Sequence, residues 1–204
     1  MYSLKRLHNK FITELIQLKA ILDDLYSQNK SLKRDIFTEG VFLRIVVIWE
    51  NFLEEYFLRT MCKCKTLNGT IIKPKVSISP NVKIAYKKLN VQKKSRDSSY
   101  LNWLDYSTLK DRTESFFHHR SRLNKIYENH QYLHEITALR NHIAHKSEKT
   151  KKDFQEKVIE RIGYLTIPNP NISDYLFSTK RRSNNKFYEI YIDYYKNLSD
   201  DLCK

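Results

Sequence analysis

The chain has 204 residues, a length that fits one domain or one domain with an appendage. Hydrophobic residues make up 41% and aromatic residues 13%, which excludes disorder of the whole chain. Three glycines and four prolines are too few for the tight turns of a β-rich fold, so long helices are expected. The net charge of +14 favours a polyanionic partner such as RNA, DNA or an acidic protein, with an anionic membrane surface as the competing interpretation.

Several other classes of protein are also disfavoured. No run of 18 apolar residues is present, so no transmembrane helix is expected. The stretch MYSLKRLHNKF lacks the apolar segment and the cleavage site of a secretion signal. Cys62, Cys64 and Cys203 match neither a disulfide framework nor a zinc ribbon and are expected to be reduced thiols. We therefore expect a cytoplasmic protein.

The first 61 residues predict two long helices. Leucines and Phe11 recur every three or four positions over 3–30, as on the apolar stripe of an amphipathic helix. In the helix expected over 32–61, apolar side chains point in nearly every direction, so it is predicted to be central and packed on several sides. Its polar residues should then be paired or lie at a rim: Arg44, Glu50, Glu54 and Glu55.

A basic segment follows a loop expected over 62–81. Eight lysines and arginines and no acidic residue fall within 73–96, and a short basic helix is expected over 81–90. The segment is interpreted either as a solvated surface or as a surface that contacts nucleic acid. In the second interpretation the substrate-binding candidates are Lys87, Lys88, Lys93 and Lys94.

The rest of the chain also predicts helices. Short ones are expected over 98–105 and 107–117, and longer ones over 120–146 and 150–165. The basic, aromatic stretch 170–202 is predicted to be one more helix docked on the bundle. The prediction is therefore an all-α bundle of four to five main helices plus short helices, with a bundle domain at 1–165 and a C-terminal extension at 166–204.

The stretch ALRNHIAHKSEK near position 140 concentrates the candidate site residues. Arg140 is followed at once by Asn141 and, five residues on, by His145. An arginine separated from a histidine by four to six intervening residues is expected about 1.2 times by chance in this composition. Arg112 with His118 or His119 also fits, so the spacing alone identifies nothing.

Helix geometry adds a constraint. Residues five apart lie roughly 140° apart around a helix axis, so Arg140 and His145 should diverge. Asn141 and His145 are four apart and His142 and His145 are three apart, so these pairs should share a face. A two-fold dimer in which the arginine of one protomer serves the histidine of the other would reunite the diverging pair.

The segment RNHIAH, downstream of WENFLEE at 49–55, resembles the signature of the HEPN superfamily, R-polar-x(3–5)-H in an α-helical bundle. The resemblance covers about residues 1–165, and only RNHIAH is specific. It implies a metal-independent endoribonuclease without a cofactor, which leaves 2′,3′-cyclic phosphate and 5′-OH ends. By this resemblance His145 is the general base or acid, Arg140 clamps the phosphate, and Asn141 orients the phosphate or His145 by hydrogen bonds. His142 and Lys146 are candidate substrate contacts. The resemblance also implies a homodimer with a composite site.

Such nucleases resemble toxins of toxin–antitoxin pairs or effectors of antiviral defence. One HEPN subgroup carries, two residues after the motif histidine, a tyrosine that its antitoxin modifies, and Ser147 stands there in this chain. Neutralisation by an acidic antitoxin that binds the protein is therefore the expected form of control.

Other interpretations stay open. The chain could be a non-catalytic HEPN-type subunit that binds RNA, a nucleotide or another protein. RNHIAH could be an exposed basic helix end, whose cations face the negative end of the helix dipole. His130 and His134, four apart, have a spacing that zinc can use, although no cysteine is near them in the sequence.

Overall fold

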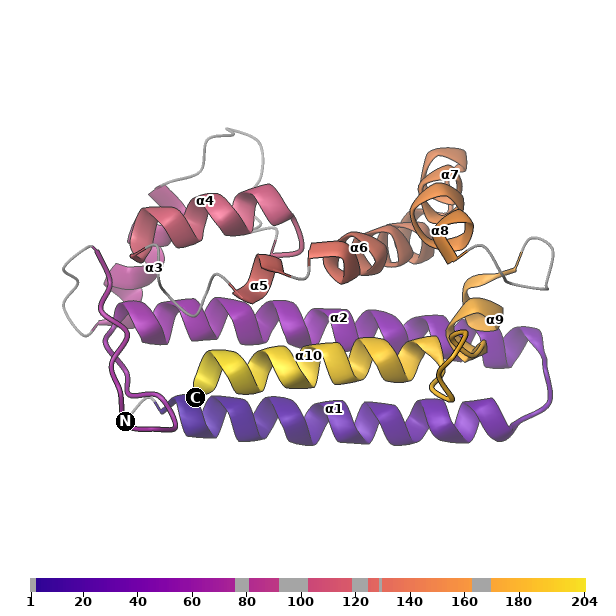
Figure 1. Cartoon of the computed structure of the whole chain (residues 1–204), viewed down its shortest axis with the longest axis horizontal. Coiled ribbons are helices and arrows are strands. Elements are labelled where there is room, and N and C mark those ends of the chain that lie inside the picture. The colour runs from indigo at the N-terminus through magenta and orange to yellow at the C-terminus, as the bar shows by residue number, and fades with distance from the viewer. Residues whose placement is uncertain (1–2, 76–80, 92–102, 119–124, 129, 163–169) are drawn as a thin grey trace. The chain divides into compact units, whose positions relative to one another are not determined.

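A computed structural model of the chain describes residues 3–75, 81–91, 103–118, 125–128, 130–162 and 170–204. The protein has an all-α fold, as predicted (Figure 1). Within these residues β pairing is limited to isolated bridges, such as the one between Lys65 and Ile71. No helix in this part of the chain is long and apolar enough to cross a membrane.

The two long N-terminal helices form as their apolar patterns predict. Helix α1 covers Leu4–Ser27 and α2 covers Leu32–Met61. The Ser31 hydroxyl accepts a hydrogen bond from the backbone N–H of Arg34 at 3.2 Å and so satisfies one free donor at the start of α2. Most of the predicted stripe of α1 is buried: Leu4, Leu7, Phe11, Leu15, Leu22 and Leu25.

Two shorter helices also lie where they were expected, α3 at Val82–Val91 and α4 at Tyr106–Phe116. The helix predicted over 98–105 is wrong at residues 103–105, which are not helical. Asp105 instead caps α4, and its carboxylate accepts a hydrogen bond from the backbone N–H of Thr108 at 2.7 Å. Residues 98–102 lie outside the described part of the chain.

The helix predicted over 120–146 is represented by α5 at Lys125–Glu128 and α6 at His130–His145. Residues 120–124 and 129 of that prediction lie outside the described residues. Helix α6 ends at His145 because Lys146 has a φ of 44°, a left-handed conformation that cannot continue an α-helix.

The helix predicted over 150–165 starts two residues early and changes type. It runs as α7 at Glu148–Phe154, a π-helical turn at Gln155–Ile159 and α8 at Glu160–Ile162. The early start follows from a capping box between Ser147 and Thr150, in which each side chain accepts from the backbone N–H of the other. Residues 163–165 lie outside the described part.

The single helix predicted over 170–202 is wrong, because the segment forms two. Helix α9 covers Ile172–Phe177 and α10 covers Phe187–Cys203. Between them the basic run makes a tight turn, in which Thr179 bridges to Lys186 and Arg182 has a φ of 63°. Hydrogen bonds that close this turn replace those that a continuous helix would need.

The described helices belong to two compact units, and the chain passes from one to the other within α1, α2 and α10 and after the first residue of α6. Unit 1 comprises Met1–Phe11, Glu50–His130 and Leu198–Lys204, and unit 2 comprises Ile12–Trp49 and Gln131–Asn197. The domain boundary predicted at residue 165 stays a prediction.

Unit 1 has an aromatic core with polar groups that find partners. The Phe57 and Trp103 rings lie 4.9 Å apart, and the Trp103 indole N–H donates to the Glu54 carboxylate at 3.0 Å. The Tyr56 hydroxyl donates to the Leu202 carbonyl at 2.8 Å. Glu54 thus meets the expectation that polar residues of α2 are paired. The three cysteines are free thiols.

Unit 2 contains most of α10, whose aromatic side chains contact α1, α2 and α6. Tyr195 stacks on Trp49 with ring centroids 4.7 Å apart. The Tyr188 hydroxyl donates to Asp23 of α1 at 2.6 Å. The fully buried Tyr191 donates its hydroxyl to the Glu135 carboxylate of α6 at 2.9 Å. The aromatic composition of the C-terminal stretch is therefore explained by burial in a core.

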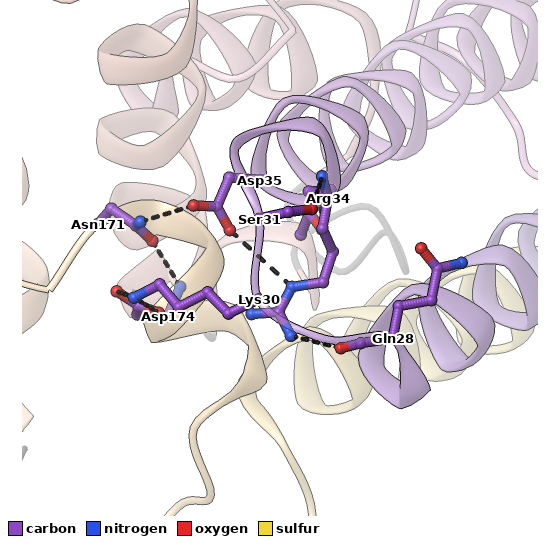
Figure 2. Close-up of polar contacts among 8 residues, drawn as sticks. Gln28, Lys30, Ser31, Arg34, Asp35, Asn171 and Asp174 are labelled. Atoms are coloured by element: carbon purple, nitrogen blue, oxygen red, sulfur yellow. Dashed lines mark hydrogen bonds and ion pairs between the residues drawn. The ribbon is translucent and has the colours of Figure 1, made fainter.

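A polar cluster joins the α1–α2 connection to the start of α9 (Figure 2). The Lys30 ammonium lies 2.7 Å from the Asp174 carboxylate, and the Asn171 amide donates to Asp35 at 3.0 Å. The Asn171 oxygen also caps α9 by accepting from the backbone N–H of Asp174 at 2.7 Å. The first turn of α2 is thereby held against the C-terminal segment.

Removal of the hydroxyl group should affect the free energy of unfolding differently at two tyrosines of α10. Tyr191→Phe takes a hydrogen bond from the buried Glu135 carboxylate and should lower the free energy of unfolding by about 1–3 kcal/mol. The Tyr194 hydroxyl is buried and has no hydrogen-bond partner in the described part of the chain. Tyr194→Phe should therefore leave the free energy unchanged or raise it slightly. Urea unfolding of both variants beside the wild type tests this, and equal losses would contradict it.

Candidate active site

The motif lies on the C-terminal half of α6, within unit 2. Leu139 and Ile143 are buried and hold this half of the helix to the core. The polar motif residues lie on its more open side: Arg140, Asn141 and His142 are half-buried, and His145 is exposed. Lys146, just after the helix, is also exposed. A ligand can therefore reach the residues that the sequence singled out.

Arg140 and Asn141 are joined through their side chains. The Arg140 Nη1 atom donates to the Asn141 Oδ1 atom at 3.1 Å. Successive residues on a helix point about 100° apart, so the long arginine side chain curves toward the asparagine to make this bond. Asn141 and His145 share a face of the helix. The Arg140 guanidinium therefore lies closer to that face than it would if the side chain pointed straight out from the helix axis. The divergence predicted for Arg140 and His145 is thus reduced within one chain.

His145 has a different environment. No hydrogen bond or ion pair joins its side chain to any residue that the structure describes, and the side chain is exposed. An imidazole at such a position is open to a ligand.

His142 is held on two sides by residues of α7. Its ring stacks on Phe154, with centroids 5.5 Å apart and an interplanar angle of 17°. Its Nδ1 atom lies 3.4 Å from the Thr150 hydroxyl. Thr150 is itself fixed by the capping box with Ser147, so the start of α7 sets the orientation of the imidazole.

Burial lowers the pKa of His142 below the usual value for histidine. The Glu39 carboxylate acts in the opposite direction on this pKa, as Glu148 does, whereas Lys146 and Lys151 lower it. The neutral imidazole, which can accept a proton, is therefore favoured near neutral pH.

Glu39 of α2 is a site residue that the sequence did not identify. Its carboxylate lies 2.8 Å from the Lys146 ammonium. This ion pair joins α2 to the end of the motif helix and removes the net charge of Lys146 from the site. The contact bridges more than 100 positions of sequence, and no local pattern marks Glu39. Thr150 and Phe154 were also missed, although the capping-box pattern at Ser147 could have indicated Thr150.

The predicted substrate-binding lysines are divided. Lys146 is part of the site, whereas Lys87 and Lys88 are exposed on α3 in unit 1. Lys93 and Lys94 lie outside the described residues. A role of 73–96 in RNA binding stays a prediction.

The basic run KRRSNNK at residues 180–186 is partly engaged with aromatic rings of unit 2. The Lys186 ammonium lies 4.0 Å from the centre of the Tyr26 ring, and that of Lys180 donates to the Tyr132 hydroxyl at 3.3 Å. These two cations therefore contribute to packing as well as to surface charge.

The second arginine–histidine spacing belongs to the core of unit 1. The Arg112 guanidinium is buried 4.6 Å from the centre of the Trp103 ring, while His118 is exposed. His119 lies outside the described residues. Arg112 therefore contributes to a packed aromatic site, and context separates it from Arg140.

The alternative zinc interpretation rested on His130 and His134. The His130 ring lies 5.4 Å from that of Tyr106, and His134 is exposed. In the part of the chain that the structure covers, no three histidine, cysteine or acidic side chains gather as a metal site would require.

Comparison of the chain with family models, with curated proteins and with solved structures found no match.

The ion pair at the site predicts a change in the pKa of His142. In Glu39→Gln this pKa should fall further, because a carboxylate that raises it is lost and the Lys146 charge is left unpaired. NMR titration of the imidazole measures the change. Glu156→Gln is a matched control, since Glu156 is an exposed residue paired with Lys152. An unchanged or raised pKa in Glu39→Gln would contradict the prediction.

Proposed function

We propose that the protein is a metal-independent endoribonuclease that needs no cofactor and is built on the HEPN-like motif of α6. The observation that supports this most is the hydrogen bond between Arg140 and Asn141, beside an unengaged His145 on an open side of the helix. A guanidinium binds a phosphate through two parallel hydrogen bonds, and an imidazole transfers protons near neutral pH. The guanidinium of Arg140 and the imidazole of His145 lie in one short segment.

The proposed reaction is attack of the ribose 2′-OH on its own 3′-phosphate. Arg140 holds the phosphate and stabilises the negative charge that grows on its oxygens. Asn141 sets the direction of the guanidinium through their hydrogen bond. His145 moves a proton during the step. The products are a 2′,3′-cyclic phosphate and a 5′-OH.

We further propose that the active form is a homodimer with the motif near its interface. One side of α2 carries an exposed apolar stripe, formed by Leu32, Ile36, Gly40 and Val47. A Cβ atom added at Gly40 would meet no atom within 4 Å, so the helix backbone is open there. Glu39 borders this apolar stripe on α2. Because Glu39 also pairs with Lys146, the stripe lies close to the motif. A second copy of the chain would cover the stripe and add its own motif to the site.

The biological role that fits this chemistry is that of a cytoplasmic toxin or antiviral-defence effector. A protein with a net charge of +14 suits neutralisation by an acidic antitoxin or regulator. A subunit that binds RNA or protein without cleaving it remains the second candidate. Intact Arg140, Asn141 and His145 favour the enzyme.

Cleavage of RNA in the presence of EDTA tests the proposed activity. The wild type should release fragments with 2′,3′-cyclic phosphate ends. Arg140→Ala and His145→Ala should lower the rate by about 100-fold or more, because each loses a group that acts in the transition state. His134→Ala, at an exposed position of the same helix, should keep the wild-type rate. Binding without cleavage by the wild type would instead support the non-catalytic subunit.

A charge on the apolar stripe tests the dimer. Ile36→Glu should weaken self-association at least about 10-fold and lower the rate per chain, because a carboxylate would be buried in the interface. Ile16→Glu on α1 is a matched control, since Ile16 is 60% exposed and Ile36 is 57% exposed. Sedimentation measures association. A wild type that is monomeric at full activity would contradict the prediction.

A further inference from the structure

Cleavage by internal transfer requires two proton movements, and only one of them is assigned so far. One group must take the proton of the 2′-OH as the O2′–P bond forms, and another must give a proton to O5′ as the P–O5′ bond breaks. Arginine is a poor proton donor or acceptor, because its guanidinium stays protonated in proteins. The amide of Asn141 does not titrate. Of the motif residues on the open side of α6, His142 is the one left that can transfer a proton near neutral pH.

His142 meets the geometric requirements. It lies three residues from His145, so the two imidazoles share a face of α6. Its ring is fixed by the stack on Phe154 and by the contact between Nδ1 and Thr150. No described residue forms a hydrogen bond with its Nε2 atom, so this nitrogen is left for a ligand. A half-buried imidazole with one nitrogen occupied and the ring fixed is pre-oriented for proton transfer.

We propose that His142 is the general base of the reaction and His145 its general acid, an assignment that rests on the proposed ribonuclease function. The neutral Nε2 atom of His142 accepts the 2′-OH proton while the 2′ oxygen bonds to phosphorus. Protonated His145 gives its proton to O5′ as the P–O5′ bond breaks. One proton is taken and one is given, so the step is balanced. Exchange with water then restores both histidines.

Charged groups of both signs surround His142. Glu39 faces it from α2, Glu148 and Lys151 face it from α7, and Lys146 follows it in the connection. On α6 itself the neighbours on the open side are Arg140, Asn141 and His145. Burial, the largest cause, favours the neutral ring, which is the form that a base must have before reaction, while the two carboxylates and the two lysines act on this pKa in opposite directions.

The pH profile of RNA cleavage in EDTA tests the assignment. In the wild type kcat/KM should fall as the pH drops through the pKa of His142, which lies below the usual value of about 6.5 for histidine. His142→Gln should lower kcat by about 100-fold and remove this acid limb, with KM changed less than about two-fold. Added imidazole should restore part of the rate of His142→Ala. His134→Gln, on the same helix, should keep the wild-type profile.

Two outcomes of this experiment would overturn the assignment alone. One is a His142→Gln enzyme that raises KM at unchanged kcat, since His142 would then only bind substrate. The other is an active His142→Gln enzyme with the acid limb intact. A wild type without any cleavage would instead remove the proposed function together with this assignment.

A binding experiment provides a readout that does not need cleavage or a folded His142 variant. A DNA oligonucleotide, which has no 2′-OH, should raise the pKa of His142 in the wild type, because its phosphate adds a negative charge beside the ring. The NMR signals of the His134 ring should keep their positions when the oligonucleotide is added at constant pH. NMR titration of both imidazoles with and without the oligonucleotide measures this. An unmoved His142 would overturn the assignment.

Discussion

The buried carboxylate of Glu135 is the constraint on which the arrangement of unit 2 depends. A carboxylate removed from water needs donors, and here they are the Tyr191 hydroxyl at 2.9 Å and the Gln131 amide at 3.0 Å. The Arg161 guanidinium forms an ion pair with the same carboxylate at 3.9 Å. Burial raises the pKa of Tyr191 well above that of a free phenol, so its hydroxyl stays a donor. These contacts set the rotation of α6 about its axis. With Glu135 turned inward, the motif that begins at Arg140 turns to the open side.

The parts of the fold that could be predicted are those with local causes. Helices α1 and α2 follow from the spacing of apolar residues and from the scarcity of glycine and proline, and both are strong signals over 20 or more positions. The division of the C-terminal stretch into α9 and α10 was missed, because its aromatic residues carry no clear period. Their burial depends on partners such as Trp49, almost 150 positions away. Single-sequence patterns do not contain that information.

In the candidate site, too, the residues with local signals could be predicted and those placed by tertiary packing could not. Arg140, Asn141 and His145 could be selected because motif and helix geometry are local. The hydrogen bond from Arg140 to Asn141 was not foreseen, because a helical wheel gives backbone directions and not the reach of a long side chain. Glu39 could not be predicted, since its contact with Lys146 is set by tertiary packing. The bare arginine–histidine spacing is a weak signal, because Arg112 fits it and is buried against Trp103.

In the proposed reaction, the cations near His142 would affect both phosphate binding and the pKa of the imidazole. Lys151 is exposed on α7 and lowers the pKa of His142, whereas Lys146 is already paired with Glu39. An RNA phosphate that entered beside Lys151 and Arg140 would bring the opposite charge close to the imidazole. The proton affinity of His142 would then be low in the free protein and higher with substrate bound. Such a base would be neutral in the free protein, and its proton affinity would rise once RNA is bound. The same cations would therefore contribute both to binding and to proton transfer.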